Sequence, residues 1–314
     1  MAEQGKDIPR PPHPQKRREP LPGQIPKFTE EDPEARRRLE VILQSPSYRE
    51  ADEDVDFLRC GETRGPRLQL DYLKAEQLLE QHGVRHTVVV FGGTRIREPT
   101  AALKQARSLG EAAAANPGDA ALARRLKVAE RLLEKSRYYD VAREFGRLVG
   151  QSNKNFPESR WFVMTGGGPG IMEAANRGAQ DAGVETIGLN IRLPNEQFPN
   201  SYVTPDLCFR FHYFAIRKLH FMLRARAFIA FPGGYGTFDE LFQTLTLAQT
   251  RTMKPVPVVL VGESYWRRAI NFEFLAEEGL IDPEDKELFW FAETAQDIWS
   301  GIRRWHAMND EMRP

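Results

Sequence analysis

The chain has 314 residues, 41% of them hydrophobic, and its 44 Lys and Arg side chains are balanced by 44 Asp and Glu side chains. This balance gives no reason to expect binding to nucleic acid or to an anionic membrane surface. No apolar stretch reaches the roughly 18–20 residues that span a bilayer, and the N-terminus lacks the apolar core of a signal peptide. We therefore expect a cytoplasmic protein.

Cysteine and histidine residues give no sign of a metal site. Cys60 and Cys208 are too few and too far apart for a disulfide framework or a cysteine-based metal site. The six histidines show no zinc-ligand spacing, and none lies near a serine nucleophile motif. We expect neither a metal nor a cofactor.

The chain begins with a segment of unusual composition. Residues 1–34 are rich in proline and charge and poor in apolar residues, which is typical of a disordered tail. Residues 35–83 carry helical patterns, at 35–44 and 70–81, and predict a helical extension. We expect the main domain to span residues 84–308.

Within that domain, short β-prone runs alternate with helical patterns. The predicted strands span residues 86–91, 161–165, 186–191, 206–211, 227–231, 256–261 and 288–291. The predicted helices span residues 99–115, 120–150, 171–182, 213–226, 237–249, 265–277 and 295–308. Strands joined by helices form a parallel sheet with both faces covered. The predicted fold class is therefore α/β, a doubly wound parallel sheet with helices on both faces and an N-terminal helical extension.

Glycine-rich turns follow the predicted strands at residues 166–170 and 232–236. Glycine lets the backbone approach a ligand closely, and a helix that follows points its first N–H groups toward an anion such as phosphate. Thr237 is predicted to open the second helix, which places Glu240 in its first turn. A phosphate site needs no acid there, so Glu240 indicates an enzyme site for a phosphorylated small molecule.

Two common nucleotide motifs do not fit these turns. Ile171 occupies the third glycine position of Gly-x-Gly-x-x-Gly, and the next strand reaches Asn190 without an acid for a ribose diol, so NAD is not expected. No Gly-x-x-x-x-Gly-Lys-Ser/Thr sequence occurs, which removes a P-loop.

Three segments together resemble the LOG (lonely guy) family. They are Thr-Gly-Gly-Gly-Pro-Gly-Ile-Met-Glu at residues 165–173, Arg217-Lys218, and Pro-Gly-Gly-Tyr-Gly-Thr-Phe-Asp-Glu at residues 232–240. The resemblance covers about residues 84–305 and includes the order and spacing of the segments. It implies a Rossmann-like phosphoribohydrolase that cleaves a nucleoside 5′-monophosphate into free base and ribose 5-phosphate. It also implies a homodimer without a metal, acting on cytokinin ribotides or on AMP.

The chain departs from the shorter members in two ways. It has a long N-terminal extension and long helices at residues 99–150, as larger bacterial members do, and it has Phe221 where plant-like members carry Met. Both departures bear on which base the protein prefers more than on which reaction it catalyses.

The resemblance implies site residues by position. Arg217 and Glu240 match the family's essential arginine and glutamate. The matching substrate-binding residues are Gly166, Gly167, Gly168, Gly170, Glu173, Lys218, Gly233, Gly234, Gly236 and Thr237. Cleavage of a ribosyl bond builds positive charge at the anomeric carbon, which a carboxylate such as Glu240 stabilises while it orients a water. We expect the N–H groups of residues 233–237, the Thr237 hydroxyl and Arg217 to hold the phosphate, and no residue is identified as proton donor to the base.

Structural interpretations remain open for several of these residues. Glu240 or Glu173 can serve as a partner for the helix dipole, and Glu173 is equally compatible with a ribose ligand. Arg217-Lys218 can be a solvated helix face, and the loop at 193–200 can be a plain connection rather than part of a base pocket. The protein as a whole can be a nucleotide-binding regulator, or a pyridoxal-phosphate decarboxylase, although Lys218 lacks the context of a Schiff-base lysine.

Overall fold

The computed structural model describes residues 11–311 except for 18, 25, 29, 156–159 and 195–197. The chain divides into two compact units, Met1–Arg67 and Leu68–Pro314. Parts of the predicted tail, residues 1–10, 18, 25 and 29, lie outside the described residues. The predicted boundaries at residues 34 and 83 stay predictions.

The first unit contains short helices with little buried surface. They are η1 (Pro22–Gln24), α1 (Ala35–Leu43), η2 (Pro46–Tyr48) and α2 (Val55–Arg59). Neither α1 nor α2 contains a buried residue, while Asp54 caps α2 by accepting hydrogen bonds from the N–H groups of Asp56 and Phe57. α3 (Arg64–Gln81) begins in this unit and continues into the second.

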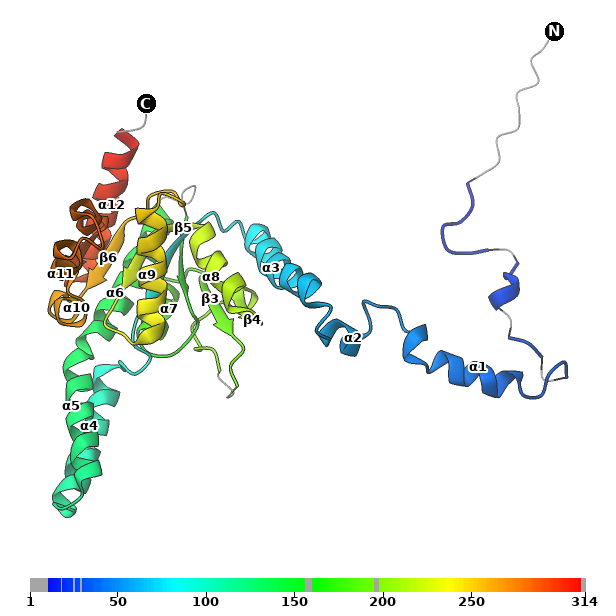
Figure 1. Ribbon diagram of the computed structural model, residues 1–314, viewed down its shortest axis with the longest axis horizontal. Helices are drawn as coiled ribbons and strands as arrows, with labels where there is room; N and C mark the ends of the chain where they lie inside the picture. Colours follow the sequence, from blue (N-terminus) through cyan, green and yellow to red (C-terminus); the bar gives the residue numbers. More distant parts are fainter. Residues whose placement is uncertain are drawn as a thin grey trace, which may run out of the picture. The chain divides into compact units, whose positions relative to one another are not determined.

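The second unit is built on a sheet of seven parallel strands (Figure 1). They are β1 (His86–Phe91), β2 (Trp161–Thr165), β3 (Thr186–Ile191), β4 (Cys208–Phe211), β5 (Ala225–Ala230), β6 (Val258–Val261) and β7 (Phe289–Ala292). Their order in the sheet is β4-β3-β2-β1-β5-β6-β7. The chain therefore winds outward from β1 in both directions, so that the winding reverses between β1 and β5.

Helices cover both faces of this sheet, because successive residues of each strand point to opposite sides. Val88 and Val90 pack in one core with α6 (Arg137–Asn155), α7 (Ile171–Asp181) and α12 (Ala295–Glu311). Val89 and Phe91 pack in the other core with α3 and the helices that follow β4, β5 and β6. Those helices are α8 (Phe214–Leu223), α9 (Tyr235–Gln249) and α10 (Glu263–Ala269). The predicted doubly wound α/β fold class is confirmed.

Two of the predicted helices are each divided in the structure. Residues 120–150 form α5 (Ala120–Lys135) and α6, since the N–H and hydroxyl of Ser136 both donate to the Leu133 carbonyl and end α5. Residues 265–277 form α10 and α11 (Phe272–Glu277), because the Asn271 side chain caps a new helix by accepting from the Phe274 N–H. α5 pairs with α4 (Pro99–Ala115), and Figure 1 shows the two side by side at one end of this unit.

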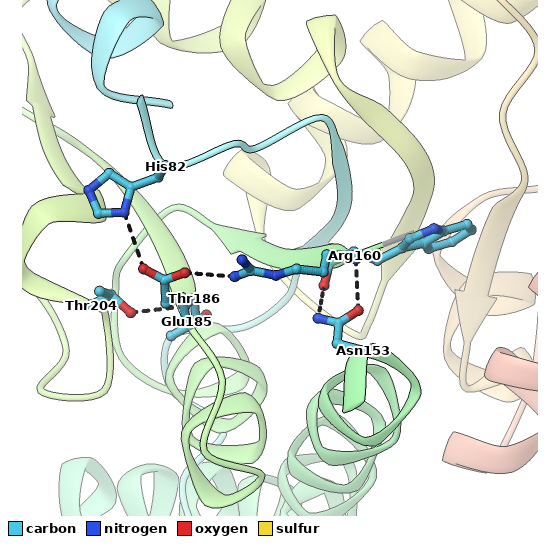
Figure 2. A network of polar contacts seen from close by, with 7 residues as sticks. His82, Asn153, Arg160, Glu185, Thr186 and Thr204 are labelled. Atoms are coloured by element: carbon cyan, nitrogen blue, oxygen red, sulfur yellow. Dashed lines mark hydrogen bonds and ion pairs between the residues drawn. The ribbon is translucent and has the colours of Figure 1, made fainter. Parts of the chain in front are cut away.

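Polar side chains fix the amino ends of β2 and β3 (Figure 2). The Asn153 amide accepts from the Trp161 N–H at 2.8 Å and donates to the Trp161 carbonyl at 2.6 Å. The Glu185 carboxylate accepts from Arg160 at 2.7 Å and contacts His82 Nδ1 at 3.1 Å. These contacts hold the amino-terminal ends of both strands. The glycine-rich turns lie at the other end of the sheet, where the strands have their carboxyl ends.

In the part of the chain that the structure describes, no helix is both long and apolar enough to cross a membrane. Cys60 and Cys208 are both free thiols.

Candidate active site

A cavity of about 380 Å³ lies at the carboxyl ends of β1, β2, β3 and β5. This is the point at which the strand order reverses, where sheets of this kind bind their ligands. Its polar lining includes Thr94, Asn190, Arg217, Tyr235, Thr237, Asp239 and Glu240. Its apolar lining includes Phe91, Met172, Ile191, Leu193 and Phe214.

The turn between β2 and α7 depends on glycine at two positions. Gly170 has φ +75°, and a Cβ there would lie 2.4 Å from the Gly93 carbonyl oxygen. Gly167 has φ +67°, and a Cβ there would lie 2.3 Å from Asn190 Nδ2. Larger residues at either position would be strained by the backbone and would meet these neighbours. Gly166 and Gly168 of the same turn line the cavity.

A buried network of hydrogen bonds supports this turn from below. Thr165 Oγ1 accepts from the Gly167 N–H at 2.9 Å and donates to Asn176 Oδ1 at 2.7 Å. Asn200 Nδ2 donates to the Gly168 carbonyl at 3.1 Å and to Asn176 Oδ1 at 3.0 Å. Asn176 also donates to Thr186 Oγ1 at 2.6 Å, so its fully buried amide joins the turn to β3.

The turn between β5 and α9 differs from its prediction in one respect. α9 begins at Tyr235 rather than Thr237, because the Gly234 carbonyl accepts from the N–H groups of Thr237 and Phe238. Glu240 therefore lies in the second turn of the helix, not the first. The N–H of Thr237 is used within the helix, which leaves the N–H groups of Tyr235 and Gly236 as anion donors at the helix start.

The second turn is itself tightly held. A Cβ at Gly233 would lie 2.1 Å from Thr237 Oγ1, so this side chain packs directly over the glycine. The Tyr265 hydroxyl donates to the Gly233 carbonyl at 2.5 Å. Gly234, Gly236 and Thr237 line the cavity.

Glu240 is a buried acid that is only partly paired. Its side chain lines the cavity although the residue is 3% exposed. Oε1 lies 3.3 Å from Lys218 Nζ, and Oε2 has no hydrogen-bond partner among the described residues. Burial raises the pKa of Glu240, while the positive charges of Lys218 and Arg217 act in the opposite direction.

Arg217, on α8, lines the same cavity as this acid and carries the opposite charge. Its guanidinium carbon lies 5.3 Å from the centre of the Phe221 ring and 5.6 Å from that of Phe214. Its buried Nε has no hydrogen-bond partner within the described chain. Burial lowers the pKa of Arg217, and the charges of Glu240 and Asp239 oppose this effect. Gly166 leaves room for the guanidinium, since a Cβ there would lie 3.4 Å from Nη2.

Lys218 and Glu173 do not line the cavity. Lys218 Nζ lies 2.8 Å from Asp239 Oδ2 and donates to Gln243 Oε1 at 3.1 Å, so it orients the acidic end of the site. Glu173 accepts a 2.8 Å hydrogen bond from the Tyr139 hydroxyl on α6. Burial raises the pKa of Tyr139 to about 12, which keeps this donor protonated.

Sequence reasoning missed most of the apolar lining and Asn190 as a cavity residue. Phe91 and Asn190 lie at or next to the carboxyl ends of β1 and β3, so strand order would have been the signal that placed them. Leu193, from the loop predicted at 193–200, does line the cavity, while residues 195–197 lie outside the described part.

Comparisons with known proteins show which family the chain is similar to. Residues 172–302 match the family described as "Possible lysine decarboxylase". The chain is 30% identical over 169 residues to cytokinin riboside 5′-monophosphate phosphoribohydrolase LOG3 of Arabidopsis thaliana, covering 52% of this chain and 74% of that protein. It is 28% identical over 163 residues to probable cytokinin riboside 5′-monophosphate phosphoribohydrolase LOGL3 of Oryza sativa subsp. japonica, covering 48% and 72%. The X-ray structure of TM1055 covers 70% of this chain and 99% of its own, with 17% identity and a TM-score of 0.42.

The fold and the cavity at the strand-order reversal define a doubly wound α/β protein with a ligand-sized cavity at the carboxyl ends of its strands. The chain belongs to the LOG family. The decarboxylase description of the matched family implies a Schiff-base lysine, yet no lysine is among the described residues that line the cavity. The residues present therefore do not fit pyridoxal phosphate.

Proposed function

We propose that this protein hydrolyses the N-glycosidic bond of a nucleoside 5′-monophosphate, either AMP or a cytokinin riboside monophosphate. The products are the free base and ribose 5-phosphate. One observation carries the proposal: Glu240 and Arg217 line one cavity, and each has a buried polar atom that lacks a partner in the described part of the chain. A buried charged group lowers the stability of the fold unless it is paired. A bound phosphate would pair with Arg217, and the positive charge of the transition state would pair with Glu240.

The chemistry assigns Glu240 to the ribose. As the bond from C1′ to the base nitrogen breaks, its electron pair leaves with the base and positive charge grows on the ribose ring. The Glu240 carboxylate stabilises this charge and takes a proton from the water whose oxygen bonds to C1′. The departing base nitrogen takes up one proton from solvent, and Glu240 returns its own proton to solvent. Burial raises the pKa of Glu240, and this makes the carboxylate a stronger base than an exposed one.

The start of α9, about one turn before Glu240, suits the phosphate. The N–H groups of Tyr235 and Gly236, the Thr237 hydroxyl and the Arg217 guanidinium are the donors that the proposal assigns to it. Phe91, Met172 and Phe214 provide apolar surface for a planar base. Anchoring both ends fixes C1′ relative to Glu240, so a nucleoside without phosphate is expected to react poorly.

Two substitutions test these roles. Glu240→Gln keeps the shape of the side chain but removes its charge, so AMP turnover should fall by roughly two orders of magnitude or more while AMP binding stays similar or tightens. Arg217→Ala removes a charge-assisted contact of roughly 1.5–3 kcal/mol and should weaken AMP binding roughly 10- to 150-fold as well as slowing turnover. Free bases released from a panel of nucleoside monophosphates would be measured by chromatography, and binding by calorimetry.

Matched controls lie on α10, outside the cavity lining. Glu263→Gln removes an exposed carboxylate that is paired with Arg267. Arg267→Ala removes a guanidinium that lies 4.8 Å from the Phe291 ring centre, as Arg217 lies over Phe221. Both controls should keep parental kinetics. If Glu240→Gln turns over AMP like the parent, the catalytic assignment is wrong and a non-catalytic nucleotide-binding regulator takes its place.

A further inference from the structure

A second hollow, which we call the arginine groove, lies between the α4–α5 pair and the loop that follows β1. Its volume is about 400 Å³. Arg95 and Arg97 line it from the loop, and Arg124 and Arg125 line it from α5. Figure 1 shows α4 and α5 lying together at one end of the sheet unit.

The described lining of the arginine groove contains four cationic side chains, all of them exposed. No Asp or Glu is among its described lining residues. None of the four arginine side chains forms an ion pair or hydrogen bond with the part of the chain that the structure describes. Arginines elsewhere are often paired, as Arg224 is with Glu76 at 2.6 Å and Arg143 with Asp181 at 2.6 Å. Four cations facing one hollow repel each other, and an anion placed there removes that repulsion.

The lining residues of the arginine groove indicate which kind of anion would bind there. Guanidinium groups bind phosphate through paired, planar hydrogen bonds, and four of them match a ligand that carries several phosphates. Leu109, Val128 and Leu132 form an apolar wall in the same groove. A volume of this size falls in the range of roughly 300–1,000 Å³ typical of small-molecule sites.

We propose that the arginine groove binds a small polyphosphorylated molecule, at a site separate from the cavity that holds Glu240. Its phosphates contact Arg95, Arg97, Arg124 and Arg125, and its non-phosphate part lies on the apolar wall. Thr94 borders both the groove and the cavity. The Gly93 N–H also donates to the Pro232 carbonyl at 2.8 Å, directly before the second glycine turn. The test therefore has to separate binding in the groove from binding in the cavity.

Calorimetric titration of the full chain with inorganic tripolyphosphate, at about 0.15 M salt to screen diffuse attraction, tests the proposal. The double variant Arg124→Gln/Arg125→Gln should bind tripolyphosphate roughly tenfold more weakly or worse. The matched control Arg303→Gln/Arg304→Gln changes another exposed adjacent pair, on α12, and should bind like the parent. Arg217→Ala should also retain binding, since Arg217 lines the cavity and not the groove. Thermal unfolding of each variant checks that it is folded.

Three outcomes overturn the proposal. The first is that the parent shows no binding of tripolyphosphate under these conditions. Equal loss in the Arg303→Gln/Arg304→Gln control would mean that binding reflects diffuse charge. Loss in Arg217→Ala with retention in Arg124→Gln/Arg125→Gln would place the ion in the cavity. None of these results bears on whether Glu240→Gln abolishes AMP turnover, so failure here is distinguishable from failure of the proposed hydrolase.

Discussion

Replacing Asn176 by alanine tests whether the buried network positions the first glycine turn. The Asn176 side chain is fully buried and takes part in four hydrogen bonds, with Thr165, Asn200, Thr186 and the Ile187 carbonyl. Each bond contributes a net of roughly 0.5–1.5 kcal/mol, so Asn176→Ala should lower the free energy of unfolding by about 2–6 kcal/mol. For a unit of this size that corresponds to a fall in Tm of about 4–24 °C.

Activity should fall along with stability, although Asn176 does not line the cavity. Without its amide, Thr165 Oγ1 loses the acceptor that orients it toward the Gly167 N–H, and Asn200 loses one of the two acceptors of its Nδ2. The turn bordering the cavity becomes less well positioned, so we expect a higher KM for the nucleoside monophosphate at temperatures where the variant is folded.

Thermal unfolding and steady-state kinetics measure these two effects. Asn116→Ala is the control, because Asn116 is exposed and makes one side-chain hydrogen bond, to the Ala112 carbonyl at 3.1 Å. It should change the free energy of unfolding by about 1 kcal/mol or less. An Asn176→Ala variant that melts within about 2 °C of the parent would refute the stabilising role of the network.

Two further predictions concern the acid and the assembly. Burial raises the pKa of Glu240 above its ordinary value of 4.5. The folded protein therefore loses stability as pH rises from 4.5 through the raised pKa, because Glu240 then ionises in a buried place. Glu240→Gln cannot ionise, so it should raise Tm at about pH 7.5, and this gain should shrink toward and below pH 4.5. A gain of equal size at both pH values would contradict this linkage. We propose a homodimer that covers the exposed Leu219 and Leu223 on α8. Light scattering at micromolar concentration should then give about twice the chain mass of 35.9 kDa. A monomeric mass at that concentration would count against the assembly.

Central strands were predictable because a strand buried on both faces reads as a continuous β-prone run. The predicted bounds of β1, β2 and β3 coincide with those in the structure. The break at Ser136 was not predictable from helical periodicity, because the apolar pattern continues across it while a local hydrogen bond to Leu133 ends the helix.

Within the site, features made by neighbouring residues of the chain could be predicted, while contacts between distant segments could not. The glycine turns could be predicted because each follows its own strand. The resemblance to known proteins predicted Arg217 and Glu240 as site residues, and both line the cavity. The position of Asn190 beside Gly167 depends on the pairing of β3 with β2, which the sequence does not state. The bond from Tyr139 to Glu173 likewise depends on how α6 packs against α7.

The position of β1 in the sheet has a consequence for synthesis on the ribosome. β1 ends at Phe91, but its neighbour on one side, β5, begins at Ala225. Ribosomes synthesise roughly 5–20 residues per second, so the residues between Phe91 and Ala225 take about 7–27 s to make. For that time β1 has no partner strand on this side, and the backbone N–H and C=O groups of Val88, Val89 and Val90 on this side have no strand partner. The half of the sheet from β1 to β4 can form first, and the cavity closes only when β5 and its glycine turn arrive.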